Sequence, residues 1–195
     1  MNAQLNHLRY PQGLFQRPDP LTERDIQGWI EDLDILPGAL RRAVAPLTEA
    51  QLAVPYRPGG WTVAQVVHHL ADSHLHGFLR LKWALTEDCP TIKPYHEDRW
   101  AALPDYGDVP VLVSVDLLEA LHRRWVALLR RLSPDQFERS FVHPESGTVT
   151  VAVNTGLYAW HGRHHLAHIT SLAEREGWVA AGPADGGRED AGRAG

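Results

Sequence analysis

Four stretches of the chain carry apolar residues every three to four positions, the spacing that places them on one face of an α-helix. These stretches cover residues 22–47, 62–85, about 114–132 and 154–177. The first opens with a capping pattern at Thr22, and Pro37 is expected to kink or interrupt it. Thr62 is the expected cap of the second, and Gly177 the expected stop of the fourth. Because almost no strand pattern accompanies them, the sequence predicts an all-α four-helix bundle.

The segments outside this pattern suggest how the chain is organised. Residues 1–21 contain three prolines and little periodicity, which predicts an extended N-terminal arm before a helical domain at 22–179. Residues 180–195 are rich in glycine and charge and are expected to be disordered. A long connection at 88–110 has mixed character and no assigned role. Alternating valines near 149–153 indicate either a hairpin strand or an extended lead-in to the fourth helix.

Composition and charge narrow the class of protein. The chain has 195 residues, of which 44% are hydrophobic and 22% charged, as in an ordinary soluble domain. A net charge of −5 and the lack of any basic run argue against a nucleic-acid partner. Cys89 is the single cysteine, so no intramolecular disulfide can form, and we expect a cytoplasmic protein. No apolar run has the roughly 20 residues that a membrane span needs.

Histidines are concentrated in the last helical stretch. His161, His164, His165 and His168 account for a third of the twelve histidines of the chain. On a helix, His161, His165 and His168 share a face with apolar residues, and His164 lies at its edge. Burying an imidazole without a partner costs about 1–3 kcal/mol. Inward histidines therefore need hydrogen-bond partners or a metal ion, and the sequence leaves both explanations open.

A histidine pair four residues apart can bind one metal ion from consecutive helical turns, as His161 and His165 would. The pair lacks the glutamate of the zinc-protease helix, so a further ligand must come from another helix. The second helix offers His69 at the margin of its apolar stripe and His74 within it. Spacing favours His74 slightly and does not decide between them. His68 is expected to point away from the stripe into solvent.

The ligand type indicates which metal would bind and what it would do. Three neutral imidazoles with an open position suit one Zn²⁺ ion per chain, with Ni²⁺ as an alternative. Such an ion lowers the pKa of a water or thiol in the open position, which is catalytic chemistry. Asp72, three residues after His69, could orient a ligand or accept a proton, or could simply be a helix-surface residue.

Three segments, GGWTVAQVVHHLADSHLHGFLRLKWALTE, IKPYHEDRWAAL and YAWHGRHHLAHI, resemble the YfiT group of the DinB-like superfamily. The resemblance extends from about Tyr10 to Trp178. It implies a four-helix bundle in up-down-down-up order, a cytoplasmic homodimer and one divalent metal ion per chain. Carried over by position, the metal ligands are His69, His161 and His165. The resemblance thus selects His69, against the slight preference that spacing gave to His74.

The same resemblance implies an enzyme that acts on a small molecule. The leading expectation is a metal-dependent hydrolase in which the three-histidine site activates water. The alternative is a metal-dependent S-transferase that uses a low-molecular-weight thiol of the bacillithiol type. A further alternative is a non-catalytic, metal-binding, stress-related dimer. Neither a nucleic acid nor a membrane is expected as a partner.

Overall fold

The structure is a computed structural model and describes residues 7–178. Its long helices are α2 (Glu23–Val44), α4 (Val63–Thr86), α7 (Val111–Leu129) and α9 (Val151–Arg175). Its short helices are α3 (Glu49–Leu52), α5 (Glu97–Trp100), α6 (Asp105–Asp108) and α8 (Pro134–Glu138). The strands β1 (Ser140–His143) and β2 (Gly147–Thr150) form a small antiparallel hairpin.

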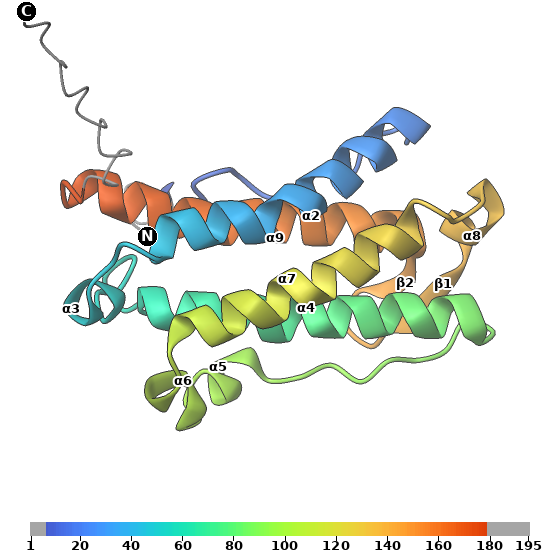
Figure 1. The fold of residues 1–195 in the computed structure, drawn as a ribbon. Coiled ribbons are helices and arrows are strands. Elements are labelled where there is room, and N and C mark those ends of the chain that lie inside the picture. Colours follow the sequence, from blue (N-terminus) through green and yellow to red (C-terminus); the bar gives the residue numbers. More distant parts are fainter. Residues whose placement is uncertain (1–6, 179–195) are drawn as a thin grey trace, which may run out of the picture.

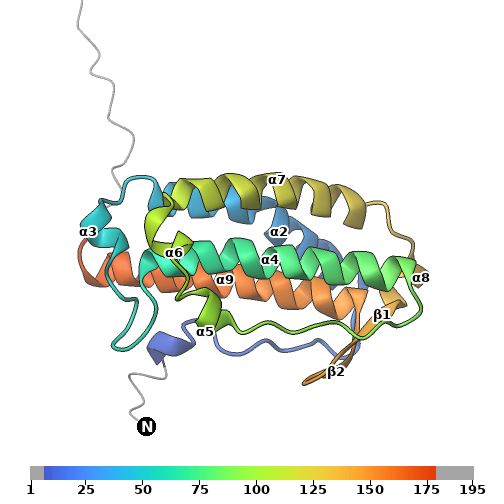
Figure 2. The same cartoon turned by 90° about the horizontal axis from the view of Figure 1, so that it is seen from below.

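The four long helices form the predicted up-down-down-up bundle. In Figure 1, α2 and α9 run in one direction along the bundle, and α4 and α7 run in the other. Both α7 and α9 pack against α2 and against α4, so α2 and α4 lie diagonally opposite. Because α4 and α7 run in the same direction, residues 87–110 must return along the length of the bundle between them. Figures 1 and 2 show this connection beside α4, carrying α5 and α6.

Threonine side chains fix where three of the long helices begin. The side chains of Thr22 and Thr62 accept hydrogen bonds from the backbone three residues on, so both predicted caps are confirmed. Thr150 caps α9 in the same way. The expected interruption at Pro37 is wrong, because α2 continues through it. Apolar residues on both sides of this proline are buried in the bundle, and such packing can outweigh the cost of one lost helical hydrogen bond.

Two other helices begin earlier than the apolar pattern suggested. Helix α7 starts at Val111 and α9 at Val151, three residues before the expected starts in both cases. The alternating valines divide between two elements: Val149 pairs with Phe141 in the hairpin, whereas Val153 already belongs to α9. The hairpin therefore exists, and the helix follows it without a linker.

The core consists of two apolar clusters separated along the bundle axis. One includes Trp29, Phe78 and Trp125, and the other includes Leu40 and Leu118. On α4 the second cluster ends at residue 70 and the first resumes at 78, and on α9 a similar gap covers residues 160–168. Most of the histidines of these two helices fall in those gaps. The bundle thus contains a histidine-rich layer between two hydrophobic ones.

Gly77 of α4 lets an aromatic ring of α9 approach the helix backbone. A Cβ atom at this position would lie 2.5 Å from the Tyr158 ring and 2.7 Å from the Trp125 ring. Neither ring can move far, since both residues are buried. The absence of a side chain at Gly77 therefore fixes Tyr158 against α4, beside the histidine layer.

The N-terminal segment packs along α9. Residues 10–21 contain no regular helix, and Phe15 packs against the apolar cluster that includes Trp29. The indole Nε1 of Trp160 donates to the backbone carbonyl of Gly13 at 3.3 Å. The expected disorder of residues 180–195 concerns a part of the chain outside the described residues. Within residues 7–178, no helix is long and apolar enough to cross a membrane.

Candidate metal centre

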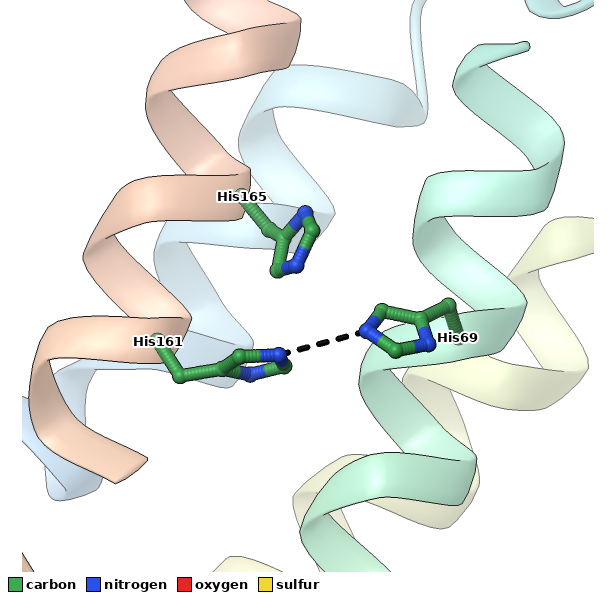
Figure 3. A group of neighbouring side chains, drawn as sticks. All are labelled: His69, His161 and His165. Atoms are coloured by element: carbon green, nitrogen blue, oxygen red, sulfur yellow. Dashed lines mark hydrogen bonds between the residues drawn. The ribbon is translucent and has the colours of Figure 1, made fainter. Parts of the chain in front are cut away.

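Three histidines from two helices converge in the middle layer of the bundle. His161 and His165 project from α9 toward His69 on α4, as Figure 3 shows. One ring nitrogen of each lies within 4.8 Å of those of the other two. The Nε2 atoms of His69 and His161 are 3.2 Å apart. These are the three residues that the resemblance selected.

The local sequence explains this convergence. His161 and His165 are four residues apart, so their side chains stack on consecutive turns of α9, with ring centroids 4.5 Å apart. Helix α4 is the antiparallel neighbour of α9, and it presents His69 opposite this pair (Figure 3). The indole of Trp61, just before α4, covers His69 with ring centroids 4.6 Å apart. The site is thus held by regular helices and covered on one side by an aromatic ring.

Burial keeps the three imidazoles neutral at physiological pH. It lowers the pKa of His69 to about 4 and drives the pKa values of His161 and His165 well below the usual range. Repulsion from neighbouring histidines, were they charged, lowers the pKa values of His161 and His165 further, and His69, His164 and His168 contribute to both shifts. Since a metal binds the neutral form of imidazole, all three side chains are in the state that ligation requires.

The observed geometry suits a divalent metal. Two ligands that bind a tetrahedral Zn²⁺ at 2.0–2.1 Å lie about 3.3 Å apart, close to the 3.2 Å between the nitrogens of His69 and His161. His165 offers a third nitrogen within 4.8 Å of those of His69 and His161. Neutral imidazoles are also the ligands that Zn²⁺ and Ni²⁺ accept. The three residues therefore fit the metal that the sequence predicted.

Behind the three histidines runs a chain of hydrogen bonds between further histidines. Nδ1 of His161 lies 3.3 Å from Nε2 of His74. Nδ1 of His74 lies 2.9 Å from Nε2 of His122, on α7. Nδ1 of His122 lies 2.5 Å from the backbone carbonyl oxygen of Leu33, on α2. The chain thus links all four long helices.

This chain assigns a tautomer to each ring. A carbonyl can only accept, so His122 donates from Nδ1 to Leu33 and its Nε2 is an acceptor. His74 must then donate from Nδ1 to His122, which leaves its own Nε2 as the acceptor for His161. His161 consequently carries its proton on Nδ1 and directs the lone pair of Nε2 toward His69. The assignment follows from the partners and from the neutral state of all three rings.

The structure places His74 and His68 differently from what spacing suggested. His74 is fully buried and lies behind His161 rather than among the three converging residues. The prediction that His68 faces solvent is wrong: it is 5% exposed, and its Nδ1 lies 2.8 Å from the Ser114 hydroxyl. Helix α7 and Tyr106 cover this side of α4, which an apolar stripe alone could not reveal.

The remaining histidines of α9 and Asp72 contact residues other than the three converging histidines. His168 stacks on Tyr56 with centroids 3.9 Å apart, and its Nε2 lies 3.0 Å from the carbonyl of Arg9. His164 stacks on Trp160 at 4.7 Å. Asp72 accepts a hydrogen bond from the Tyr106 hydroxyl at 2.6 Å, and burial raises its pKa. The carboxylate thus bonds to a residue of α6 rather than to one of the three converging histidines.

A cavity of about 540 Å³ opens beside the three histidines. The 87–110 connection forms one wall of this cavity, from Pro94 to Glu97. Sequence reasoning missed the other polar side chains that line it, which are Ser73, Arg80, His143, Glu145 and Tyr158. Ser73 and Arg80 follow His69 at helical spacing, a signal that was present in the sequence. His143 and Glu145 come from the hairpin, whose position no sequence pattern indicated.

Comparison with known proteins gives consistent matches over most of the chain. Residues 32–169 match the model of the DinB superfamily. A Bacillus cereus protein named "Putative metal-dependent hydrolase" is 54% identical over 174 residues, which cover 89% of this chain and 100% of the relative. A relative of the same description from Oceanobacillus iheyensis is 53% identical over 170 residues, which cover 87% of this chain and 98% of the relative.

The fold also matches a solved structure. YfiT from Bacillus subtilis, described as a probable metal-dependent hydrolase with an unusual four-helix bundle topology, superimposes with a TM-score of 0.86 at 45% sequence identity. The match covers 89% of this chain and 99% of YfiT. Sequence and structure therefore agree, and the chain belongs to the DinB superfamily.

Proposed function

We propose that this protein is a metal-dependent hydrolase whose single divalent ion, Zn²⁺ in the simplest case, is held by His69, His161 and His165. One observation carries the proposal: three neutral imidazoles converge from two helices at the wall of a cavity. A cavity of this size accommodates a small-molecule substrate. The names of the relatives from Bacillus cereus and Oceanobacillus iheyensis support the same class of activity.

The ligand set favours catalysis over a structural role. Structural zinc sites close the coordination sphere with four protein ligands and commonly use cysteine. Only three candidate ligands converge here among the described residues, and the single cysteine, Cys89, is exposed near Ser140. A divalent ion with an open position lowers the pKa of a water there and polarises a substrate carbonyl.

The protein residues around the site would orient the ion and its surroundings. The hydrogen bond from Nδ1 of His161 to His74 holds the ligand ring in one orientation and one tautomer. Trp61 and Tyr95 line the cavity with aromatic surface, which restricts access of bulk water. Tyr158 precedes His161 by one turn of α9 and lines the same cavity. Burial raises the pKa of its hydroxyl, which therefore stays protonated and can donate to a substrate oxygen.

The test is metal-dependent hydrolysis of simple activated substrates. Protein loaded with Zn²⁺ or Ni²⁺ is assayed on a panel of p-nitrophenyl esters and p-nitroanilides, before and after chelator treatment and again after metal return. We expect activity that chelation removes, that metal restores, and that His161→Ala abolishes. His68→Gln serves as the control, because His68 bonds to Ser114 outside the site. Hydrolysis that neither chelator nor His161→Ala affects would contradict the proposal, as would turnover only with added thiol.

A further inference from the structure

Arg80 is a buried positive charge for which the described part of the chain supplies no counter-ion. The residue is 9% exposed, and no carboxylate between residues 7 and 178 forms an ion pair with it. Its one hydrogen bond within that range runs from Nη1 to the Tyr158 hydroxyl, at 3.3 Å. An isolated buried charge is costly, and buried guanidinium groups are normally paired with an anion. The structure thus leaves Arg80 without a pairing anion among these residues.

The guanidinium group belongs to the same cavity as the candidate metal centre. Arg80 and Tyr158 line it together with His69, His161 and His165. Arg80 follows His69 by eleven residues, which is three helical turns, so both lie on one face of α4 about 16 Å apart along its axis. Long side chains on a helix lean toward its N-terminus, which brings the guanidinium back toward His69. Its partner Tyr158 is one turn from His161 on α9.

The other charges in the cavity limit which anion would bind. Glu97 and Glu145 also line it, and neither forms an ion pair with Arg80. Two carboxylates and one guanidinium give the lining a net charge of −1, which a divalent ion at the three histidines would raise to +1. This balance favours a singly charged anion over a doubly charged phosphate. The planar guanidinium matches the two oxygens of a carboxylate. The same positive charge contributes, after burial, to lowering the pKa of His143.

We propose that Arg80 binds a carboxylate of the substrate, so that the metal centre acts on small molecules carrying a carboxylate at a distance from the reacting group. This inference rests on the proposed function, because it assigns the far end of a substrate whose reacting end lies at the three histidines. The Tyr158 hydroxyl would contribute a second hydrogen bond to the same group. A rival explanation is that the Glu145 side chain turns inward and neutralises Arg80 in solution.

The test measures ligand binding rather than turnover. Cobalt-substituted protein is titrated with ω-mercaptocarboxylates of three to six carbons and with ω-mercaptoalcohols of the same lengths, and the sulfur-to-cobalt absorption band is followed. The affinity of an alcohol measures only the binding of its sulfur to the open position on cobalt. The affinity of the matched carboxylate includes, in addition, the contact with Arg80. Wild type, Arg80→Gln, Arg80→Lys and Glu145→Gln are compared. Circular dichroism and cobalt content establish that each variant is folded and loaded.

We expect at least one carboxylate to bind about ten-fold or more tightly than its matched alcohol, as a charge-assisted hydrogen bond predicts. Arg80→Gln should remove this preference and leave the alcohol affinities unchanged. Arg80→Lys should keep part of the preference, because lysine retains the positive charge but cannot form the paired hydrogen bonds of a guanidinium. Glu145→Gln should not weaken it. The inference would be overturned if wild type bound the carboxylates and their matched alcohols equally. It would also be overturned if the preference for carboxylates persisted in Arg80→Gln, because the carboxylate would then be binding cobalt itself.

Failure of the proposed function would look different. If the protein binds no cobalt, or if no thiol changes the spectrum, the metal centre itself is refuted. In that case, calorimetry of the metal-free protein with butyrate and inorganic phosphate addresses Arg80 directly. Butyrate binding that is lost in Arg80→Gln would support the anion site independently of any metal. No binding of butyrate, or tighter binding of phosphate, would overturn it.

Discussion

His74 and His122 are as deeply buried as His69 and His165, but their ring nitrogens have different partners. His74 and His122 are 0% and 2% exposed, and both nitrogens of each ring belong to the hydrogen-bond chain that ends on Leu33. His69 and His165 are 5% and 8% exposed, and each has a buried Nδ1 without a partner among the described residues. The two groups lie side by side in the same layer.

A nitrogen without a partner does not by itself mark a candidate ligand, because His68, His164 and His168 also have one among the described residues. What marks the candidate ligands is the convergence of their rings. A buried ring with two hydrogen-bond partners is already satisfied and serves to orient its neighbours. The converging rings instead bring one nitrogen each within 4.8 Å of the other two, so that one metal ion can bind all three. His161 joins the two groups, because its Nδ1 belongs to the chain and its Nε2 to the convergence.

The largest effect is expected from removing a converging ring. His165→Ala leaves two imidazoles, so the affinity for Zn²⁺ should fall by more than the 10- to 100-fold typical of supporting residues. Competition with a chromophoric chelator measures the dissociation constant. His168→Ala, one turn further along α9, is the matched control and should bind as wild type does. Equal affinities for wild type and His165→Ala would remove the distinction between the two groups.

A second large effect concerns pH and the supporting group. Burial lowers the pKa of His122 to about 4, whereas in the unfolded chain it is near 6.5. Below pH 6.5 the unfolded state therefore takes up a proton that the folded state refuses until about pH 4. The free energy of unfolding should fall across this window, by on the order of 3 kcal/mol for this residue.

Urea unfolding of metal-free protein at pH 7 and pH 4.5 measures this loss. His122→Gln keeps a donor for Leu33 and an acceptor for His74 but cannot titrate, so its stability should decline less with acid than that of wild type. Parallel losses in the two proteins would show that His122 does not resist protonation in the folded state.

A smaller effect should follow from breaking the hydrogen-bond chain at its contact with a ligand. His74→Leu leaves Nδ1 of His161 without an acceptor, so the affinity for Zn²⁺ should fall about 10- to 100-fold while one ion still binds. His74→Gln retains an acceptor and should lose less. The same chelator competition measures both. If Leu and Gln had equal effects, the role of His74 would be packing and not orientation of His161.

The smallest effect is expected at His68, which is buried but bonded to Ser114 away from both groups. His68→Gln should leave the affinity for Zn²⁺ unchanged and alter the free energy of unfolding by no more than about 1 kcal/mol, the net value of one hydrogen bond. Metal titration and urea unfolding measure the two quantities. A marked loss of metal affinity in His68→Gln would extend the centre to a residue that the structure places outside it.

The sequence predicted the helices well because their signals are local. Apolar periodicity and the capping threonines Thr22 and Thr62 depend only on neighbouring residues, and the structure confirms them. The early starts of α7 and α9 were missed because their first three residues, Val-Leu-Val and Val-Ala-Val, are unbroken apolar runs without helical periodicity. The sequence could not choose between a kink and an interruption at Pro37, because the outcome depends on packing against other helices.

The candidate site was predictable in part. The spacing of His161 and His165 was a local signal, but the choice between His69 and His74 needed the resemblance to a family. Spacing cannot show that His74 forms a hydrogen bond with His122 of α7, since the two residues are 48 positions apart in the chain. The same limit explains why His68 seemed to face solvent and why the 88–110 connection, although long enough to form a pocket wall, could be assigned no role from the sequence.

The central claim is that His69, His161 and His165 hold a divalent metal, and the most direct test is the metal content of the protein purified without chelator. Elemental analysis of wild type, His69→Ala and His122→Gln should give about one divalent ion per chain for wild type and His122→Gln, and none for His69→Ala. A wild-type protein that contains no metal and takes up none from Zn²⁺ or Ni²⁺ would contradict the account, as would full metal content in His69→Ala.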